Sequence, residues 1–168
     1  PYYDRAEKAM GSTHVHGRPP LPANNNYKVF ANGAEKAGYK FYATGPYATN
    51  AEEYDGRPAS IQDGFNFQGD KNKSKWSILV REMPRAEQTG LLDLRPNSQA
   101  VQITHNAEGQ VDAVLYLDKE GNLHRQAAKL VCLAANSIES PRLLLLSGTP
   151  RFPDGLANSS GQVGRNYM

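Results

Sequence analysis

Small and polar residues at positions 134–137 form the end of an apolar run and the turn that follows it, just before a segment with helical character. The run at 130–135 does not alternate between apolar and polar residues, which is typical of a strand buried on both faces of a parallel sheet. Ser140 and Pro141 indicate the start of a helix whose body is 143–146. Because the unpaired first amides of a helix and its positive end favour anions, this strand–turn–helix unit can bind a nucleotide phosphate or can serve packing alone.

The glycine pattern that would make nucleotide binding specific is not in the sequence. No Gly-x-Gly-x-x-Gly occurs, and the nearest spacing, Gly161 and Gly164, follows no predicted strand. We therefore expect the primary dinucleotide fingerprint to lie outside this chain or to be missing from the protein.

The histidines and the cysteine form no catalytic or metal-binding pattern. A single cysteine, Cys132, excludes an intrachain disulfide and a thiolate metal cluster. His14 and His16 alternate as on a strand but lack a third ligand. His105 and His124 fall in or beside predicted hairpins. We predict no catalytic residue and no metal site within the chain.

Charge and hydropathy exclude several classes of partner. The 168 residues include 19 basic and 17 acidic side chains, with a net charge of +2. The nearest basic cluster, Lys71, Lys73 and Lys75, is expected to be a solvated loop, so we predict no nucleic-acid partner. The longest apolar runs are far shorter than the roughly 20 residues of a membrane helix, so no direct membrane span is predicted.

Residues 1–73 are rich in Gly, Pro, Asn and Tyr and are predicted to be dominated by loops. Helical spacing predicts a helix over 2–10 that ends at Gly11. A second helix is predicted over 27–37, with Asn26 as its N-cap. Its buried face is expected to consist of Val29, Phe30, Ala34 and Ala37. The segment 39–73 is longer than an ordinary connection, and such loops are usually functional or wrap another domain.

Residues 74–149 have the periodicity of regular structure, and we place a domain boundary near Lys73. Ser74 is expected to cap a helix that Pro84 ends or kinks. Period-two alternation then predicts a short strand followed by a β-meander of two hairpins. These strands are expected at 91–94, 100–105, 111–117 and 123–127. The predicted fold class is α+β or α/β, with the β-meander, one buried parallel-type strand and several helices.

The segment from Lys129 to Gly148 resembles the second signature of the glucose–methanol–choline (GMC) oxidoreductases, in which a strand, small residues, a Ser-Pro pair, leucines and Ser-Gly follow one another. Asn136 stands where glycine is usual in that signature. The Val-Gly-Arg-Asn tail at 163–166 is similar to another family element, and the start of the chain up to Gly11 is similar to the helix that opens the family's middle region. The resemblance covers nearly the whole chain, which we expect to be an internal fragment of a longer protein.

Within the family, the chain most resembles the bacterial branch that oxidises sugars, sugar acids and polyols, such as gluconate- and glucose-type dehydrogenases. The residues that carry this similarity are 18–22, 56–58 and 157–160. The resemblance implies that FAD is the cofactor of the full-length protein and that a hydride passes from an alcohol carbon to the flavin. We do not expect this fragment by itself to hold FAD tightly. It assigns the catalytic base to a His-rich C-terminal segment that this chain does not contain.

The resemblance also implies a set of cofactor-binding residues in the FAD-binding part, 74–168, while 1–73 corresponds to a loop-rich part of the substrate-binding or cap region. One strand of the family reads the adenine ring through its backbone, and two further segments lie along the diphosphate and ribose. In this sequence the matching positions are Ala100 and Val101 for the adenine, Ala135 and Asn136 for the diphosphate and ribose side, and Arg165 and Asn166 nearby.

Some members of this branch ligate an iron–sulfur cluster through a Cys-rich loop. The corresponding residues, 61–69, contain no cysteine. We therefore predict no cluster in this segment and expect electrons to leave the flavin by another route.

A non-catalytic carbohydrate-binding or interaction module is the alternative function. Its candidate surface consists of Tyr27, Tyr39, Tyr42, Tyr47 and Tyr54. For the enzyme, the expected partners are a small alcohol or sugar substrate, the rest of the parent chain and an electron-transfer subunit. Periplasmic, membrane-associated and cytoplasmic locations all agree with the sequence.

Overall fold

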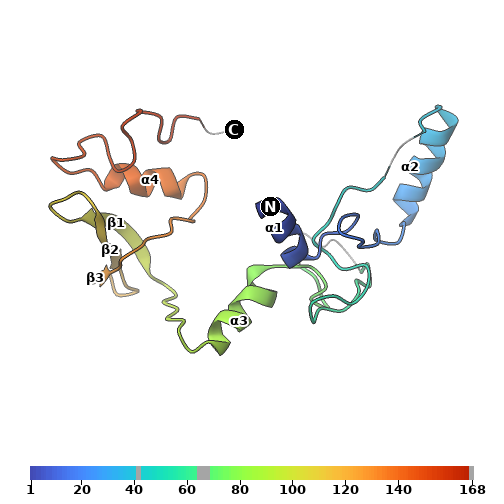
Figure 1. The fold of residues 1–168 in the computed structure, drawn as a ribbon, viewed down its shortest axis with the longest axis horizontal. Coiled ribbons are helices and arrows are strands. Elements are labelled where there is room, and N and C mark those ends of the chain that lie inside the picture. Colours follow the sequence, from blue (N-terminus) through green and yellow to red (C-terminus); the bar gives the residue numbers. More distant parts are fainter. Residues whose placement is uncertain (41–42, 64–68, 167–168) are drawn as a thin grey trace. The chain divides into compact units, whose positions relative to one another are not determined.

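The computed structural model describes residues 1–40, 43–63 and 69–166 of the chain. They belong to two compact units, an N-terminal unit, Pro1–Leu92, and a C-terminal unit, Asp93–Met168 (Figure 1). Helices occur in both units, and a three-stranded antiparallel sheet lies in the second, so the predicted α+β class is confirmed. The predicted boundary near Lys73 falls inside the N-terminal unit. The assignment of 1–73 to a substrate region and of 74–168 to a cofactor domain stays a prediction.

Helix α1, Tyr2–Met10, begins the N-terminal unit and matches the sequence prediction. It ends at Gly11, whose φ of 67° is left-handed and whose neighbour Ser12 donates its N–H to the Glu7 carbonyl. A Cβ at Gly11 would lie 2.6 Å from the Tyr54 ring. This helix end therefore requires glycine both for its backbone conformation and for the approach of the ring.

Helix α2, Asn25–Lys36, starts earlier than predicted. Its N-cap is Asn24, whose side chain accepts the Tyr27 N–H at 2.9 Å, and not Asn26. The predicted buried face is wrong except at Ala34, because the side chains of Val29 and Phe30 are exposed. Among the described residues no other helix or strand packs against α2.

The next helical segment starts with a π-turn, Ile78–Glu82, and continues as α3, Met83–Gln88. Its N-cap is Ser77, which accepts the Val80 N–H at 3.2 Å. The prediction that Ser74 caps this helix is wrong: Ser74 is fully buried, and its hydroxyl donates to Asp70. Helix type changes at Met83, just before Pro84, whose missing N–H cannot join the α-helical ladder.

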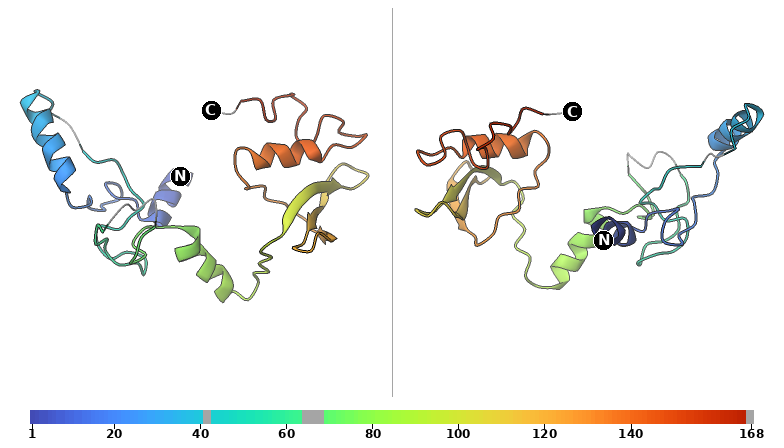
Figure 2. Two further views of the ribbon diagram at one scale, coloured as in Figure 1. Left: turned by 180° about the vertical axis from the view of Figure 1, so that it is seen from behind. Right: turned by 45° about the horizontal axis from the view of Figure 1, so that its top comes forward.

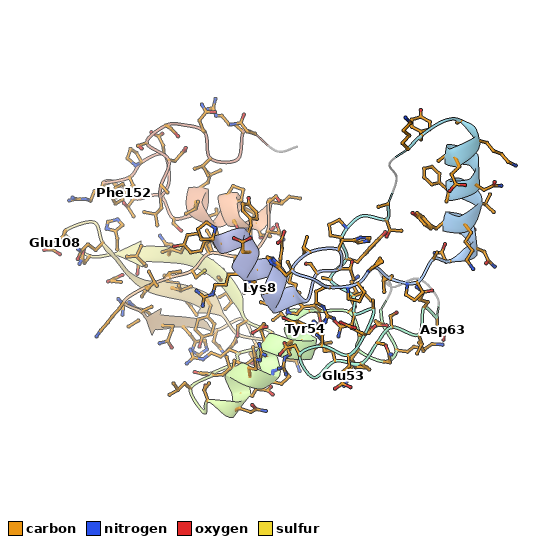
Figure 3. All side chains as sticks on the ribbon, turned by 45° about the vertical axis from the view of Figure 1, so that its right-hand side comes forward. Lys8, Glu53, Tyr54, Asp63, Glu108 and Phe152 are labelled. Carbon is orange, nitrogen blue, oxygen red and sulfur yellow. The ribbon has the colours of Figure 1, made fainter. Side chains whose placement is uncertain are left out.

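The interior of the N-terminal unit is polar and is organised by Arg57, which is 2% exposed. Its guanidinium donates to the carbonyl oxygens of Ser74 at 3.0 Å and Met10 at 2.8 Å. The hydroxyl of Tyr54 donates to the Lys8 carbonyl at 2.8 Å, and Figure 3 shows Tyr54 beside Lys8 on α1. Arg57 and Tyr54 therefore tie the end of α1 to the loop-rich segment that follows.

The C-terminal unit contains the predicted β-meander. Strands β1, Gln99–His105, β2, Val111–Leu117, and β3, Leu123–Ala127, pair antiparallel in the order β1-β2-β3 (Figure 2). The predicted strand at 91–94 is not formed, and Leu91 and Leu94 are exposed. Two hairpins thus account for the sheet, and β1 lies at one edge of it.

Helix α4, Glu139–Leu146, packs against β1. The core between them consists of Ile103, Leu143 and Leu156, and Phe152 packs against it. The loop after the helix returns at Gly155, where a Cβ would lie 2.8 Å from the Leu144 carbonyl oxygen. The small core of this unit is therefore made by one strand, one helix and the loop that follows the helix.

The segment 130–135 is not the doubly buried strand that its apolar run predicts. It forms no helix and pairs with no strand of the described residues, and Leu130 is 86% exposed. Val131 and Leu133 pack against the core, while Cys132 is exposed. A parallel strand needs neighbours on both edges and cover on both faces. In the part of the chain that the structure describes, only one face of this segment is covered, by the core of the C-terminal unit.

Two other predictions concern membranes and iron–sulfur clusters. Across 1–40, 43–63 and 69–166, no helix has both the length and the apolarity that a bilayer crossing requires. The segment predicted to lack a cluster, 61–69, lies largely outside the described residues, because only 61–63 and 69 belong to them.

Candidate cofactor site around helix α4

The turn before α4 is closed by the side chain of Asn136. Its Oδ1 accepts the N–H groups of Ile138 and Glu139, each at 2.8 Å. The Asn136 carbonyl accepts the Ser140 N–H at 3.1 Å, and the Ser140 hydroxyl accepts the Asn136 N–H at 3.2 Å. Asn136 and Ser140 therefore form a reciprocal cap, with Asn136 in the role that the sequence predicted for Ser140.

This cap changes the prediction that the first amides of α4 are free to hold a phosphate. Pro141 has no N–H, and the Arg142 N–H already donates to the Ile138 carbonyl at 3.2 Å. The amides at 138, 139, 140 and 142 are thus all occupied by acceptors of the chain itself. An anion can reach those at 138 and 139 only by displacing the Asn136 side chain.

The edge strand β1 contains the two residues whose backbone groups are predicted to bind the adenine ring. Ala100 faces Tyr116 and Gln102 faces Leu115, so Val101 is an extra residue, a β-bulge, in β1. Both Ala100 and Val101 are partly buried, and Ala100 packs against the core of the unit. A bulge leaves a residue outside the regular ladder and is common beside binding sites.

Ser147 fixes β1 against the end of α4. The Ile103 N–H donates to Ser147 Oγ at 2.8 Å, and that hydroxyl donates to the Leu143 carbonyl at 2.7 Å. Ser147 is fully buried. Sequence reasoning missed this residue. The available signal was a serine four residues after Leu143, the spacing at which a helical serine bonds back to the preceding turn.

The C-terminal loop lies along the other side of α4. A Cβ at Gly164 would lie 3.6 Å from both Pro141 and Leu145, so this turn follows the surface of the helix. Arg165 and Asn166, which follow it, are exposed, and the Asn166 amide donates to the Gln162 side chain at 2.9 Å. All six predicted cofactor residues therefore belong to the C-terminal unit, on β1 or on segments that flank α4.

The histidines of this unit have structural partners. His105 lies 2.8 Å from the Thr149 hydroxyl and packs edge-on against Phe152. His124 bonds Asp118 at 2.7 Å, and this hydrogen bond is the main reason that the pKa of Asp118 is lowered from its ordinary value. The prediction that neither histidine is catalytic stays a prediction. Figure 3 shows Phe152 near Glu108 at the tip of the β1–β2 hairpin.

A hollow of about 790 Å³ opens elsewhere on the C-terminal unit, between the start of β2 and the segment 127–131. Asp112 and Lys129 are its charged lining residues. None of the six predicted cofactor residues lines it. The predicted site is therefore a surface built on β1 and α4 and is separate from this hollow.

Comparison with known proteins settles the family. Residues 1–168, the entire chain, match the GMC oxidoreductases. The chain belongs to the GMC oxidoreductase family. The family prediction made from the signature at 129–148 is thereby confirmed.

The chain is similar to several curated enzymes. The fructose dehydrogenase large subunit of Gluconobacter japonicus is 31% identical over 100% of this chain and 33% of that protein. The 2-methyl-1,2-propanediol dehydrogenase of Mycolicibacterium austroafricanum is 30% identical over 100% of this chain and 32% of that protein. The gluconate 2-dehydrogenase flavoprotein of Pantoea cypripedii is 28% identical over 99% of this chain and 32% of that protein.

The chain spans about a third of the length of these relatives. Their names include sugar, sugar-acid and polyol dehydrogenases, in agreement with the predicted branch of the family, and none is a carbohydrate-binding module. Of the tyrosines proposed for such a module, Tyr54 is engaged with Lys8 and lies under the Arg18 guanidinium at 4.0 Å. Tyr42 lies outside the described residues.

Proposed function

We propose that the chain is part of an FAD-dependent oxidoreductase that oxidises a CH–OH group of a sugar, sugar acid or polyol. The observation that carries this proposal is the match of the whole chain to the GMC oxidoreductases, together with relatives named as dehydrogenases of fructose, gluconate and a propanediol. One of these relatives is named a flavoprotein. FAD, when bound, accepts a hydride from the alcohol carbon.

The donor set of the C-terminal unit fits the nucleotide half of FAD. The bulged edge of β1 at Ala100 and Val101 offers backbone groups to a base, and Arg165 offers an exposed guanidinium to a phosphate. Asn136 is exposed and can interact through its side chain. Since its Oδ1 occupies the first amides of α4, these residues would hold a diphosphate through side chains and not through the helix N-terminus.

The same proposal extends to the division of labour within the chain. Residues 74–168 would contribute to the cofactor domain, and 1–73 would contribute to the substrate side. The relative from Gluconobacter japonicus is named a large subunit, which supports an electron-transfer subunit as a partner of the full-length protein. The chain supplies no catalytic base in this proposal.

The test is the absorption spectrum and the steady-state kinetics of the full-length protein. We expect absorption bands at roughly 370 and 450 nm from bound FAD, which can be released by denaturation and identified by mass. Under anaerobic conditions, one member of a panel of sugars, sugar acids and polyols should bleach the longer-wavelength band. A protein that is purified without these bands and does not acquire them with added FAD would overturn the proposal.

A further inference from the structure

Three side chains on α1 and the turn that follows it bring metal-binding atoms together. Asp4, Glu7 and His16 each offer one ligand atom, and all three atoms lie within 4.8 Å of one another. Asp4 and Glu7 lie one helical turn apart on α1, so both carboxylates are on the same face. We propose that these three side chains bind a divalent transition-metal ion of the zinc class.

The donor set is suited to such an ion. An imidazole nitrogen and two carboxylate oxygens are typical zinc ligands, at about 2.0 to 2.2 Å from the metal. Tetrahedral ligands at that distance are roughly 3.4 Å apart. His16 Nε2 and Glu7 Oε2 are 2.8 Å apart, so the ion requires this pair to separate slightly and Asp4 to approach. Water would complete the coordination from the exposed side.

The turn that supplies His16 is held against the rest of the unit. Thr13 is fully buried, its N–H donates to the Tyr47 carbonyl at 2.9 Å, and its hydroxyl accepts the Tyr47 N–H at 2.9 Å. His16 has a left-handed backbone, with φ of 52°, and its side chain is 25% exposed. The imidazole is therefore positioned toward α1 by a fixed turn, which lowers the entropy that metal binding must overcome.

The existing partners of the carboxylates are weak competitors. The Asp4 side chain is 62% exposed, and the Glu7–His16 pair is partly exposed. Exposed pairs of this kind contribute little stability. A divalent ion would replace the Glu7–His16 hydrogen bond by direct coordination, and it would link the turn at 14–17 to α1.

The experiment is a calorimetric titration of Zn²⁺ into the full-length protein after treatment with a chelator. We expect wild type to bind one equivalent of Zn²⁺. In Glu7→Gln and in His16→Gln the affinity for this ion should fall at least about tenfold or be lost, because each change removes a direct ligand. Asp4→Asn should also lower the affinity for this Zn²⁺ ion. The Asp4 side chain is 62% exposed, so we expect this variant to fold. This proposal is independent of flavin binding.

The matched control is His124→Gln. His124 also pairs with a carboxylate, that of Asp118 at 2.7 Å, but it belongs to no three-ligand cluster among the described residues. It should leave the number of bound Zn²⁺ ions and their affinity unchanged. The proposal is overturned if wild type binds no Zn²⁺ at about 100 µM, or if Glu7→Gln, His16→Gln and Asp4→Asn, each with a wild-type circular dichroism spectrum, bind as wild type does.

Discussion

The backbone N–H of Ile103 in β1 donates to the hydroxyl of Ser147 at the end of α4, at 2.8 Å, and both residues are buried. The same hydroxyl donates to the Leu143 carbonyl. One serine thus satisfies an outward-facing amide of an edge strand and sets the position of the strand along the helix. This contact aligns the bulged part of β1 with α4, on which the proposed cofactor surface depends.

Ser147→Ala should destabilise the protein by about 1 to 3 kcal/mol, because it leaves the buried Ile103 N–H without an acceptor. Urea unfolding of the full-length protein measures this change. Ser98→Ala is the control, since Ser98 is exposed and should change the free energy of unfolding by less than about 0.5 kcal/mol. Equal stability of Ser147→Ala and wild type would show that the contact is not important.

Asn136→Gly should raise the affinity for FAD about tenfold, because the two amides of Ile138 and Glu139 that it exposes outnumber the one side-chain amide that it removes, and a net gain of one hydrogen bond to a charged group contributes about 1.5 to 3 kcal/mol. Its cost in helix capping should be only a few tenths of a kcal/mol. Flavin titration of the apoprotein, followed by fluorescence, measures the affinity.

Asn136→Asp is the informative counterpart of Asn136→Gly. A carboxylate keeps the cap of α4, but its negative charge repels a diphosphate, so the affinity for FAD should fall while stability is retained. If Asn136→Gly and Asn136→Asp shift the FAD affinity in the same direction, the cap does not control access to these amides.

Asp55 should make the stability of the protein depend on pH in the acid range. Its hydrogen bond with Arg81 is the largest cause that lowers the pKa of the Asp55 carboxyl below 3.8, and Arg85 adds to it. Because the folded pKa lies below the unfolded one, this stabilisation is fully present above the unfolded pKa. It is lost as the pH falls below that value and through the folded pKa.

Asp55→Asn should therefore destabilise the protein at pH 7 by about 1 to 3 kcal/mol and flatten this part of the pH profile. Asparagine tolerates the left-handed φ of 52° at this position, so the backbone is retained. Asp93→Asn, whose side chain is 69% exposed, is the control and should alter neither property. Chemical unfolding between pH 3 and pH 7 measures both, and an unchanged slope in Asp55→Asn would contradict the assignment.

Gly155→Ala should destabilise the protein by more than about 3 kcal/mol, because the added Cβ would lie 2.8 Å from the Leu144 carbonyl oxygen as well as requiring a left-handed backbone. Gly121→Ala shares the left-handed backbone, with φ of 84°, but meets no neighbouring atom within 4 Å. It should cost only about 1 kcal/mol. Thermal unfolding of the two variants should separate them clearly, and similar melting temperatures would exclude the steric explanation.

The sequence by itself predicted those features whose causes are local. Helical spacing followed by Gly11 was sufficient for α1, because a left-handed glycine ends a helix whatever lies around it. Alternating residues and short turns were sufficient for the β-meander, because a hairpin brings neighbouring segments together. The signature at 129–148 was sufficient for the family.

Tertiary structure decided every feature that depends on a partner distant in the sequence. An apolar run such as 130–135 records what a segment can bury but not whether cover exists, and the exposure of Leu130 shows that one face has none among the described residues. The acceptor for Ile103 lies 44 residues away, at Ser147, and His16 meets Glu7 only after the chain reverses at the end of α1. Pattern and propensity act over a few residues, whereas burial and hydrogen-bond partners are settled only when the chain has packed.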